Sequence, residues 1–217
     1  MTLELKKRFV TSIFLIIFFY CIFIDKNFLA ISLILVSLIS FYEFIKMNFK
    51  IFKNKRALRY ILNTIFILYI FILSLILYTF ILSPSTVMVI ILTFLICIAS
   101  DIGGYVSGKI FKGKKLTKIS PNKTISGSLG SFVFSILIIY LFSFFKLLSI
   151  DFRLIIFALI TSLFCQLGDI LFSFLKRKAK IKDTGNILPG HGGVLDRIDG
   201  ILFGIPVGIL TLYLLSV

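Results

Sequence analysis

Long apolar runs are the feature of this sequence that most limits how the chain can fold. Seven of them, separated by short polar stretches, lie at residues 9–24, 28–45, 61–82, 86–100, 128–149, 154–175 and 199–217. A helix needs roughly 17–25 mostly apolar residues to cross the hydrocarbon core of a membrane. The apolar share of the chain, 59%, also exceeds the roughly 45–50% of soluble domains. We therefore predict an all-α, polytopic integral membrane protein with about seven transmembrane helices and polar loops.

The distribution of positive charge predicts the orientation of these helices. The chain carries 24 Lys and Arg residues and a net charge of +15. All but three of them (Lys26, Lys146 and Arg153) lie in alternate loops, on one side of the predicted membrane. Since basic loops are retained in the cytoplasm, we expect the N-terminus there, in the cell (inner) membrane. Topology thus explains the charge without nucleic acid as a partner, and anionic substrates or membrane lipids are compatible with it.

Three local features have plain interpretations. The apolar run after Arg8 imitates a signal peptide but lacks a small-residue cleavage site, so we expect an uncleaved first helix. Cys21, Cys97 and Cys165 stand singly in apolar runs and are interpreted as packing residues. The basic loop at 46–60 is interpreted as an anchor at the lipid headgroups, and binding of an acidic lipid substrate is the alternative.

The stretch 100–131 is rich in glycine, serine and lysine. Ser100, Gly104 and Gly108 recur every four residues, which favours close helix packing. Lysines then surround Ser120 and Thr124, at positions Lys109, Lys112, Lys114, Lys115, Lys118 and Lys123. Backbone N–H and ammonium groups in such a loop can bind phosphates, although the P-loop pattern is not matched. The alternative is that these lysines serve only to keep the loop on the cytoplasmic side of the membrane.

A polar stripe crosses the sixth apolar run. Its members recur at steps of three and four, on one helical face: Ser162, Gln166, Asp169, Ser173, Lys176 and Arg177. An ionised Asp inside an apolar helix costs roughly 2.5–3.5 kcal/mol on insertion scales. Asp169 therefore needs a compensating partner, which is either a bound cation or the side chain of a nearby Lys or Arg.

The polar link after this run holds further carboxylates. Asp196 and Asp199 are three residues apart, so they share one face if the last helix begins near Leu195. A helix N-terminus also favours carboxylates, which is the simpler explanation. Hard oxygen ligands indicate Mg²⁺ rather than Zn²⁺. His191, within Pro-Gly-His-Gly-Gly, is interpreted as a turn residue or phosphate contact rather than a metal ligand.

Glycine recurs every four residues at the start of the last apolar run. Gly200, Gly204 and Gly208 form a packing ridge that would let this helix press against the sixth. We expect this packing to bring Asp196 and Asp199 near Asp169.

These side chains favour one class of chemistry. The sequence contains no Ser-His-Asp arrangement, HExxH or CxxC. Metal-assisted phosphoryl or nucleotidyl transfer fits best, because positioning and charge neutralisation supply most of its catalysis. If the nucleophile is itself a phosphate, with a second pKa of about 6, it is mostly dianionic at neutral pH and no strong base is required.

Two blocks of residues resemble the phosphatidate cytidylyltransferase (CDP-diacylglycerol synthase) family. The C-terminal block comprises Gln166-Leu167-Gly168-Asp169, Ser173, Lys176-Arg177, Lys182-Asp183 and the run from Pro189 to Asp199. The other block comprises Asp101, Gly103, Tyr105, Gly108, the run from Ile119 to Thr124, and Gly127. Together the blocks cover about a third of the chain.

The resemblance implies a nucleotidyltransferase of phospholipid biosynthesis. CTP and phosphatidic acid would give CDP-diacylglycerol and diphosphate with Mg²⁺, beside which a monovalent cation such as K⁺ is a further expectation. The expected catalytic residues are Asp169, Asp196, Lys176 and Arg177. The expected metal ligands are Asp169, Asp196, Asp199 and Asp183. The expected substrate-binding residues are Lys123, Ser120, Thr124, His191, Arg197 and Asp101.

The same resemblance suggests how the chain is organised. We expect N-terminal membrane helices at 1–99 and a catalytic membrane region at 100–217, within one continuous membrane domain, with the active site facing the cytoplasm. The partners expected are CTP, phosphatidic acid and membrane lipids, and a homodimer is left open.

Two departures from the family and two alternative functions accompany this interpretation. Ser126 stands where the family usually has Glu, and the chain is shorter than typical members, chiefly in its N-terminal half.

A CTP-dependent polyprenol or phytol kinase is one alternative function. A lipid or ion transporter is the other, with Asp169 as an ion site, but it leaves the cluster of lysines and carboxylates unexplained.

Overall fold

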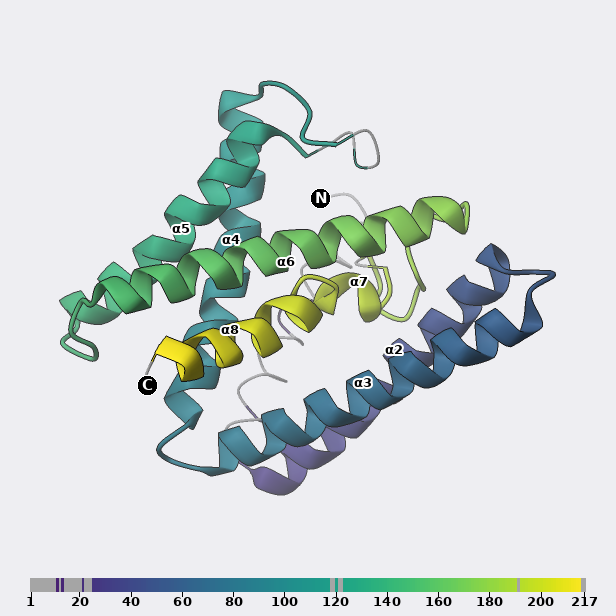
Figure 1. The fold of residues 1–217 in the computed structure, drawn as a ribbon, viewed down its shortest axis with the longest axis horizontal. Coiled ribbons are helices and arrows are strands. Elements are labelled where there is room, and N and C mark those ends of the chain that lie inside the picture. The colour runs from purple at the N-terminus through teal and green to yellow at the C-terminus, as the bar shows by residue number, and fades with distance from the viewer. Residues whose placement is uncertain are drawn as a thin grey trace. The chain divides into compact units, whose positions relative to one another are not determined.

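The computed structural model describes residues 11, 13, 21, 25–117, 120, 123–190 and 192–215 (Figure 1). Within them, six helical stretches are long and apolar enough to cross a membrane: Lys26–Ile51, Arg56–Leu82, Val87–Phe111, Ile125–Phe144, Phe152–Lys178 and Leu195–Leu215. The only β-pairing in this part of the chain is two isolated bridges. The predicted all-α membrane fold is therefore confirmed there. The predicted first span, 9–24, lies almost wholly outside the described residues.

The helices group into two compact units. The first unit comprises Met1–Val87 and Leu175–Ile198, and the second comprises Met88–Phe174 and Asp199–Val217. The predicted division between residues 99 and 100 separates a catalytic region from the preceding membrane helices and does not refer to contacts. It stays a prediction.

The first unit is built on a helical hairpin. Its two long helices, α2 (Lys26–Ile51) and α3 (Arg56–Leu82), lie side by side (Figure 1). The rings of Phe44 and Phe66 stack with centroids 3.8 Å apart, and Asn48 Nδ2 donates to Asn63 Oδ1 at 2.9 Å. The short helix α7 (Leu195–Ile198) packs against α2, so a segment far along the chain returns to this hairpin.

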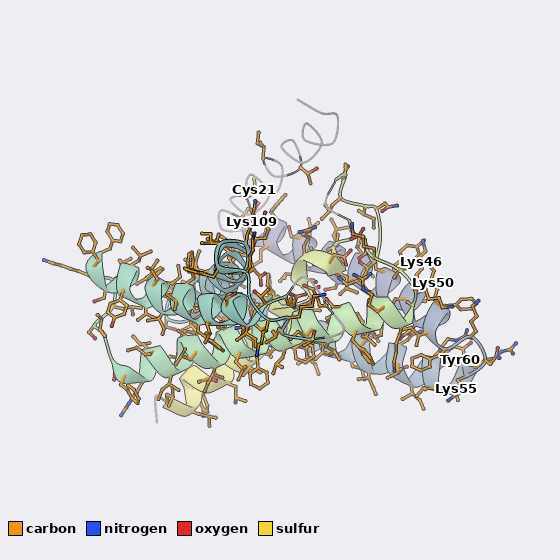
Figure 2. The ribbon with its side chains drawn as sticks, turned by 90° about the horizontal axis from the view of Figure 1, so that it is seen from above. Cys21, Lys46, Lys50, Lys55, Tyr60 and Lys109 are labelled. Carbon is orange, nitrogen blue, oxygen red and sulfur yellow. The ribbon has the colours of Figure 1, made fainter. Side chains whose placement is uncertain are left out.

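Basic and aromatic side chains gather at one end of the hairpin. Figure 2 shows Lys46, Lys50, Lys55 and Tyr60 there. The ammonium of Lys46 lies 4.2 Å from the ring centroid of Tyr42 on the same helix. Cations and exposed aromatic rings together are typical of a helix end at the lipid headgroups. This arrangement is compatible with the interpretation of the loop at 46–60 as an anchor at the lipid headgroups.

The second unit contains four helices around an apolar centre. They are α4 (Val87–Phe111), α5 (Ile125–Phe144), α6 (Phe152–Lys178, which ends in the first unit) and α8 (Ile201–Leu215). The buried core residues come from three of these helices: Leu92, Ile96, Ile139, Phe157 and Ala158. Leu212 and Leu215 of α8 pack against them.

Small residues bring these helices close together, as predicted. On α4, a Cβ at Gly103 would lie 2.6 Å from the carbonyl oxygen of Gly130 on α5. Directly before α8, a Cβ at Gly200 would lie 2.8 Å from Cys165 Sγ, and on α8 one at Gly208 would lie 2.7 Å from Thr161 Oγ1, both on α6. Real Cβ atoms do not approach so closely, so a larger residue at any of these three positions would force the neighbouring helix to move.

Several predicted boundaries were wrong, among them that of the fifth span, expected at 128–149, where α5 covers Ile125–Phe144. The fourth span does not end at residue 100, because α4 continues to Phe111 while its glycines pack on α5. Asp101 therefore lies within a helix, and the polar loop begins at Lys112.

The last span, expected at 199–217, begins earlier, at Leu195, and a turn at Asp199 and Gly200 interrupts it between α7 and α8. Asp199 Oδ1 accepts a hydrogen bond from the N–H of Gly200 at 2.9 Å. Asp196 and Asp199 therefore do not share the face of one continuous helix.

Gly204→Val should destabilise the second unit. A Cβ at Gly204 would lie 2.6 Å from Cys97 Sγ and 3.3 Å from Cys165 Cβ, and overpacking of a filled core costs about 1–3 kcal/mol. We expect a lower unfolding temperature in detergent. Leu210→Val, at a position that is 55% exposed, is the control. Equal melting of Gly204→Val and the unsubstituted protein would contradict the helix packing described here.

Candidate active site

In the first unit, Asp196 is the centre of a dense set of hydrogen bonds. Its side chain is only 5% exposed, and its Oδ1 lies 2.8 Å from Lys176 Nζ at the end of α6. Its Oδ2 accepts hydrogen bonds from the backbone N–H groups of Thr184 at 2.8 Å and Gly193 at 3.0 Å. A buried carboxylate is stable only with such partners. The structure thus joins two predicted catalytic residues, Lys176 and Asp196.

A second buried carboxylate lies beside this pair. Glu43 of α2 is 1% exposed, and its Oε1 accepts a hydrogen bond from the N–H of Val194 at 3.1 Å. Its Oε2 accepts from the N–H of Leu195 at 2.9 Å and from Thr184 Oγ1 at 2.8 Å. Thr184 Oγ1 is also 3.0 Å from Asp196 Oδ2, so one hydroxyl lies between the two carboxylates.

Sequence reasoning missed Glu43 although a signal was present. Glu43 is the only acidic residue in the predicted span 28–45. An ionisable residue inside a membrane span is a functional hypothesis by default, and this holds for Glu43 as it does for Asp169. What periodicity could not indicate is its partner, since Leu195 is 152 positions away in sequence.

Two glycines allow the chain to close around these carboxylates. Gly192 has φ +85°, a left-handed conformation that glycine adopts without strain. Gly193 has no room for a side chain, because a Cβ there would lie 2.3 Å from Thr184 Oγ1 and 2.5 Å from Glu43 Oε2. The Gly-Gly sequence is therefore explained by local geometry.

In the second unit, Asp169 of α6 forms an ion pair with Lys123. The side chains are 34% and 23% exposed, so the pair is partly open to solvent. Ser173 Oγ, one turn further along α6, donates to Asp169 Oδ1 at 3.4 Å. Asp169 thus has the basic partner that one of the two sequence interpretations required.

The loop that carries Lys123 is closed by backbone hydrogen bonds. The N–H of Leu116 donates to the carbonyl of Lys123 at 2.7 Å, and the N–H of Ile125 donates to the carbonyl of Lys114 at 3.0 Å. Thr124 caps α5, with its Oγ1 accepting from the N–H of Gly127 at 3.1 Å. These bonds hold Lys123 directly before the first turn of α5.

Ser126 takes part in the same closure. Its Oγ donates to the carbonyl oxygen of Lys112 and lies 3.0 Å from Thr124 Oγ1. Lys112 has φ +52°, at the point where the chain leaves α4. The serine that replaces the glutamate of the resembled family therefore joins the two ends of the loop.

The remainder of the polar stripe on α6 faces its neighbours in the second unit. Ser162 Oγ is 2.9 Å from Ser100 Oγ on α4, and Ser128 Oγ on α5 donates to Gln166 Oε1 at 2.6 Å. These neutral pairs satisfy polar groups between apolar helices. Through Ser162 and Gln166, which precede Asp169 on α6, this helix contacts both α4 and α5.

Asp101 and Asp199 lie against the same part of α6. Cys165 Sγ is 3.8 Å from Asp101 Oδ1, and Cys165 itself is fully buried, as a packing residue should be. A Cβ at Gly168 would lie 2.6 Å from the carbonyl oxygen of Asp199. The predicted approach of Asp199 to the Asp169 region is thus confirmed for its backbone.

Three of the remaining predicted site residues lie in the first unit and one lies in the second. Asp183, Arg177 and Arg197 are exposed in the first unit. In the second unit the carbonyl of Ser120 accepts from the N–H of Lys123 at 3.1 Å. His191 lies outside the described residues.

Few of the described acidic side chains lie close enough together to share a metal ion. Among the residues that the structure describes, no three His, Cys, Asp or Glu side chains are grouped closely enough to hold one. Mg²⁺, however, is usually bound through one or two carboxylates together with substrate phosphates and water. Asp169 and Asp196 each face a lysine ammonium, so each presents carboxylate oxygens to a cation. Each carboxylate, taken by itself in its own unit, is a donor of the kind that Mg²⁺ takes in this mode.

Comparison with known proteins gives matches over much of the chain. A family model described as the cytidylyltransferase family matches residues 51–215. The phosphatidate cytidylyltransferase of Helicobacter pylori (strain ATCC 700392 / 26695) is 42% identical over 115 residues, which cover 53% of this chain and 43% of that protein. The phosphatidate cytidylyltransferase of Bacillus subtilis (strain 168) is 43% identical over 120 residues, covering 54% and 45%. The chain spans about half the length of the curated relatives it matches. These matches confirm the family resemblance.

Lys176→Met should destabilise the first unit. It leaves the buried charge of Asp196 without its ammonium partner, and breaking a buried pair in this way costs roughly 3–5 kcal/mol. We expect a clearly lower unfolding temperature in detergent. Lys180→Met, at an exposed position two residues beyond the end of α6, is the matched control. Should both variants melt like the unsubstituted protein, the ion pair contributes nothing and the site geometry is wrong.

Proposed function

The chain belongs to the cytidylyltransferase family, and from this premise we propose that it transfers the cytidylyl group of CTP to phosphatidic acid. The products are CDP-diacylglycerol, a precursor in phospholipid biosynthesis, and diphosphate. The observation that carries the proposal is the pair of lysine–carboxylate contacts, Lys123–Asp169 and Lys176–Asp196. All four residues lie in the matched range, and the relatives bear the name phosphatidate cytidylyltransferase.

The proposed reaction is a displacement at phosphorus. An oxygen of the lipid phosphate attacks the α-phosphorus of CTP and forms the new P–O bond. The bond from the α-phosphorus to the oxygen that bridges to the β-phosphorus breaks, and diphosphate leaves with its electron pair. The attacking phosphate is mostly dianionic at neutral pH, so the site has to orient two anions and neutralise their charge rather than supply a strong base.

The basic side chains have the role of phosphate contacts in this proposal. Lys123 and Lys176 are held by carboxylates in their respective units, so their ammonium groups are placed before any substrate binds. Arg177 and Arg197 are exposed and able to reach an anion. The proposed substrate contacts also include Ser120, Thr124, His191 and Asp101.

Mg²⁺ is the proposed metal. The resemblance assigns the metal to Asp169 and Asp196, with Asp199 and Asp183 as further candidates and a neighbouring monovalent cation such as K⁺. Bound Mg²⁺ would withdraw charge from the phosphate oxygens and so favour displacement. The chain's own contribution is to orient the carboxylates through Ser173, Thr184 and Gly193.

The proposed location is the cell (inner) membrane, with the N-terminus and the site facing the cytoplasm. Two crossings, α5 and α6, separate the loop before Ile125 from the segment after Lys178. Both polar segments therefore lie on the side that the basic residues assign to the cytoplasm, where CTP is dissolved. A homodimer is an expectation of the resemblance only.

Release of diphosphate from CTP by the purified protein tests the proposed function. The assay is run with phosphatidic acid, with a polyprenol and without lipid, each with and without Mg²⁺. We expect diphosphate and a CDP-lipid only with phosphatidic acid and Mg²⁺. CDP formed with polyprenol would indicate a kinase instead, and no turnover by well-folded protein would favour a transporter.

Asp169→Asn and Asp196→Asn should each abolish turnover while the protein still inserts. Loss of the metal's charge stabilisation, several kcal/mol, corresponds to at least about 100-fold in rate at about 1.4 kcal/mol per factor of ten. Asp151→Asn, an exposed acid whose side chain accepts from the N–H of Arg153, is the control. Near-normal activity of both site variants at ordinary Mg²⁺ would refute the metal assignment.

A further inference from the structure

Glu43 is a buried acid that the proposed reaction leaves without a role. It lies on α2, outside residues 51–215 that the family model matches. It is 1% exposed, although an acidic side chain is almost never buried so completely without partners. Its three partners all belong to one short part of the chain: Thr184, Val194 and Leu195.

These three hydrogen bonds fix both ends of a segment. We define the return segment as residues 184–190 and 192–195, the described part of the chain that leads back to α7. Glu43 holds its first residue, Thr184, and its last two, Val194 and Leu195. Leu195 is itself fully buried, so its N–H depends on Glu43 for a partner and would otherwise carry the cost of an unsatisfied buried donor.

The return segment in turn supplies the partners of Asp196. The N–H groups of Thr184 and Gly193 donate to Asp196 Oδ2, and the Thr184 hydroxyl lies between Asp196 and Glu43. Asp196 Oδ1 then faces Lys176 at 2.8 Å. A displacement of the segment therefore changes the orientation of both Asp196 and Lys176.

The space around Glu43 is closed. A Cβ at Gly185 would lie 2.4 Å from Glu43 Oε1, and a Cβ at Gly193 would lie 2.5 Å from Oε2. The return segment thus touches the carboxylate through two residues that have no side chain. Such a close fit leaves little freedom for the segment as long as the hydrogen bonds to Glu43 are made.

We propose that Glu43 is a positioning residue of the active site. It fixes the return segment so that Lys176 and Asp196 face each other, and it acts through them without touching substrate. This proposal rests on the proposed function. It assigns to α2, a helix outside the matched range, a direct part in shaping the site of phosphate and metal binding.

Glu43→Gln is the informative substitution because it keeps the size of the side chain. Oε1 accepts one hydrogen bond and Oε2 accepts two, and an amide offers only one oxygen. Its NH₂ group then faces at least one N–H donor of the return segment. Thr184→Val, which removes the shared hydroxyl with little change of shape, is a second variant should the first fail to fold.

Asn48→Ala is the matched control on the same helix. Asn48 is also 1% exposed, but its side chain donates to Asn63 on α3 at 2.9 Å and not to the return segment. Both variants remove buried hydrogen bonds of α2, so both are expected to lower the unfolding temperature. Only a positioning role predicts that Glu43→Gln alone disturbs the return segment.

Two measurements on the full chain in detergent, without substrate, test the contact itself. One is amide hydrogen exchange over residues 184–195, and the other is acylation of Lys176 relative to exposed Lys109. At temperatures where each variant is fully folded, we expect Glu43→Gln and Thr184→Val to raise exchange and Lys176 labelling by about tenfold, the factor for about 1.4 kcal/mol of lost protection. Asn48→Ala should leave both unchanged. Wild-type exchange and labelling in Glu43→Gln would overturn the proposal.

A kinetic measurement tests the consequence for function. We expect kcat for CDP-diacylglycerol formation to fall by about 100-fold in Glu43→Gln, as for other small misplacements of reacting groups, and to change little in Asn48→Ala. Equal losses in the two variants would reduce Glu43 to a stabilising residue and overturn its positioning role. If the wild-type protein forms no CDP-lipid, the proposed function fails, whereas exchange and labelling still decide whether Glu43 holds the segment.

Discussion

Ionised carboxylates among apolar helices need polar partners, and the polar parts of this protein are arranged to supply them. An aspartate within a membrane span costs roughly 2.5–3.5 kcal/mol on insertion scales. Asp169 is paired with Lys123 from a loop, and Asp196 with Lys176 from the end of α6. Glu43 receives three hydrogen bonds from the return segment. The loops are thereby fixed by the same charges that the proposed chemistry requires.

Helix packing in the second unit also determines where polar residues lie. Glycines at 200, 204 and 208 bring α8 against α6, where side chains would otherwise separate the backbones. The carbonyl of Asp199 consequently lies against Gly168, directly before Asp169. Small residues thus determine where the polar residues of adjacent helices meet, and neutral pairs such as Ser100–Ser162 satisfy the groups in between.

Much of this arrangement could be predicted from residue patterns. Apolar run length located six of the helices, and recurring glycines indicated the faces that pack. The stripe on α6 identified Asp169 because an acid in an apolar run is costly wherever it occurs. Local patterns failed where the deciding partner is distant in sequence. Gly103 of α4, beyond Asp101, packs against Gly130 of α5, and the N–H of Leu195 is a partner of the buried acid at position 43.

The proposed function is the transfer of a nucleotidyl group to a lipid phosphate. The most direct test is to supply CTP labelled with ³²P at either the α- or the γ-phosphorus, together with phosphatidic acid, Mg²⁺ and the purified protein. The account predicts that the α-label enters the lipid and the γ-label leaves as diphosphate. Transfer of the γ-label to lipid, or of neither label, would contradict it.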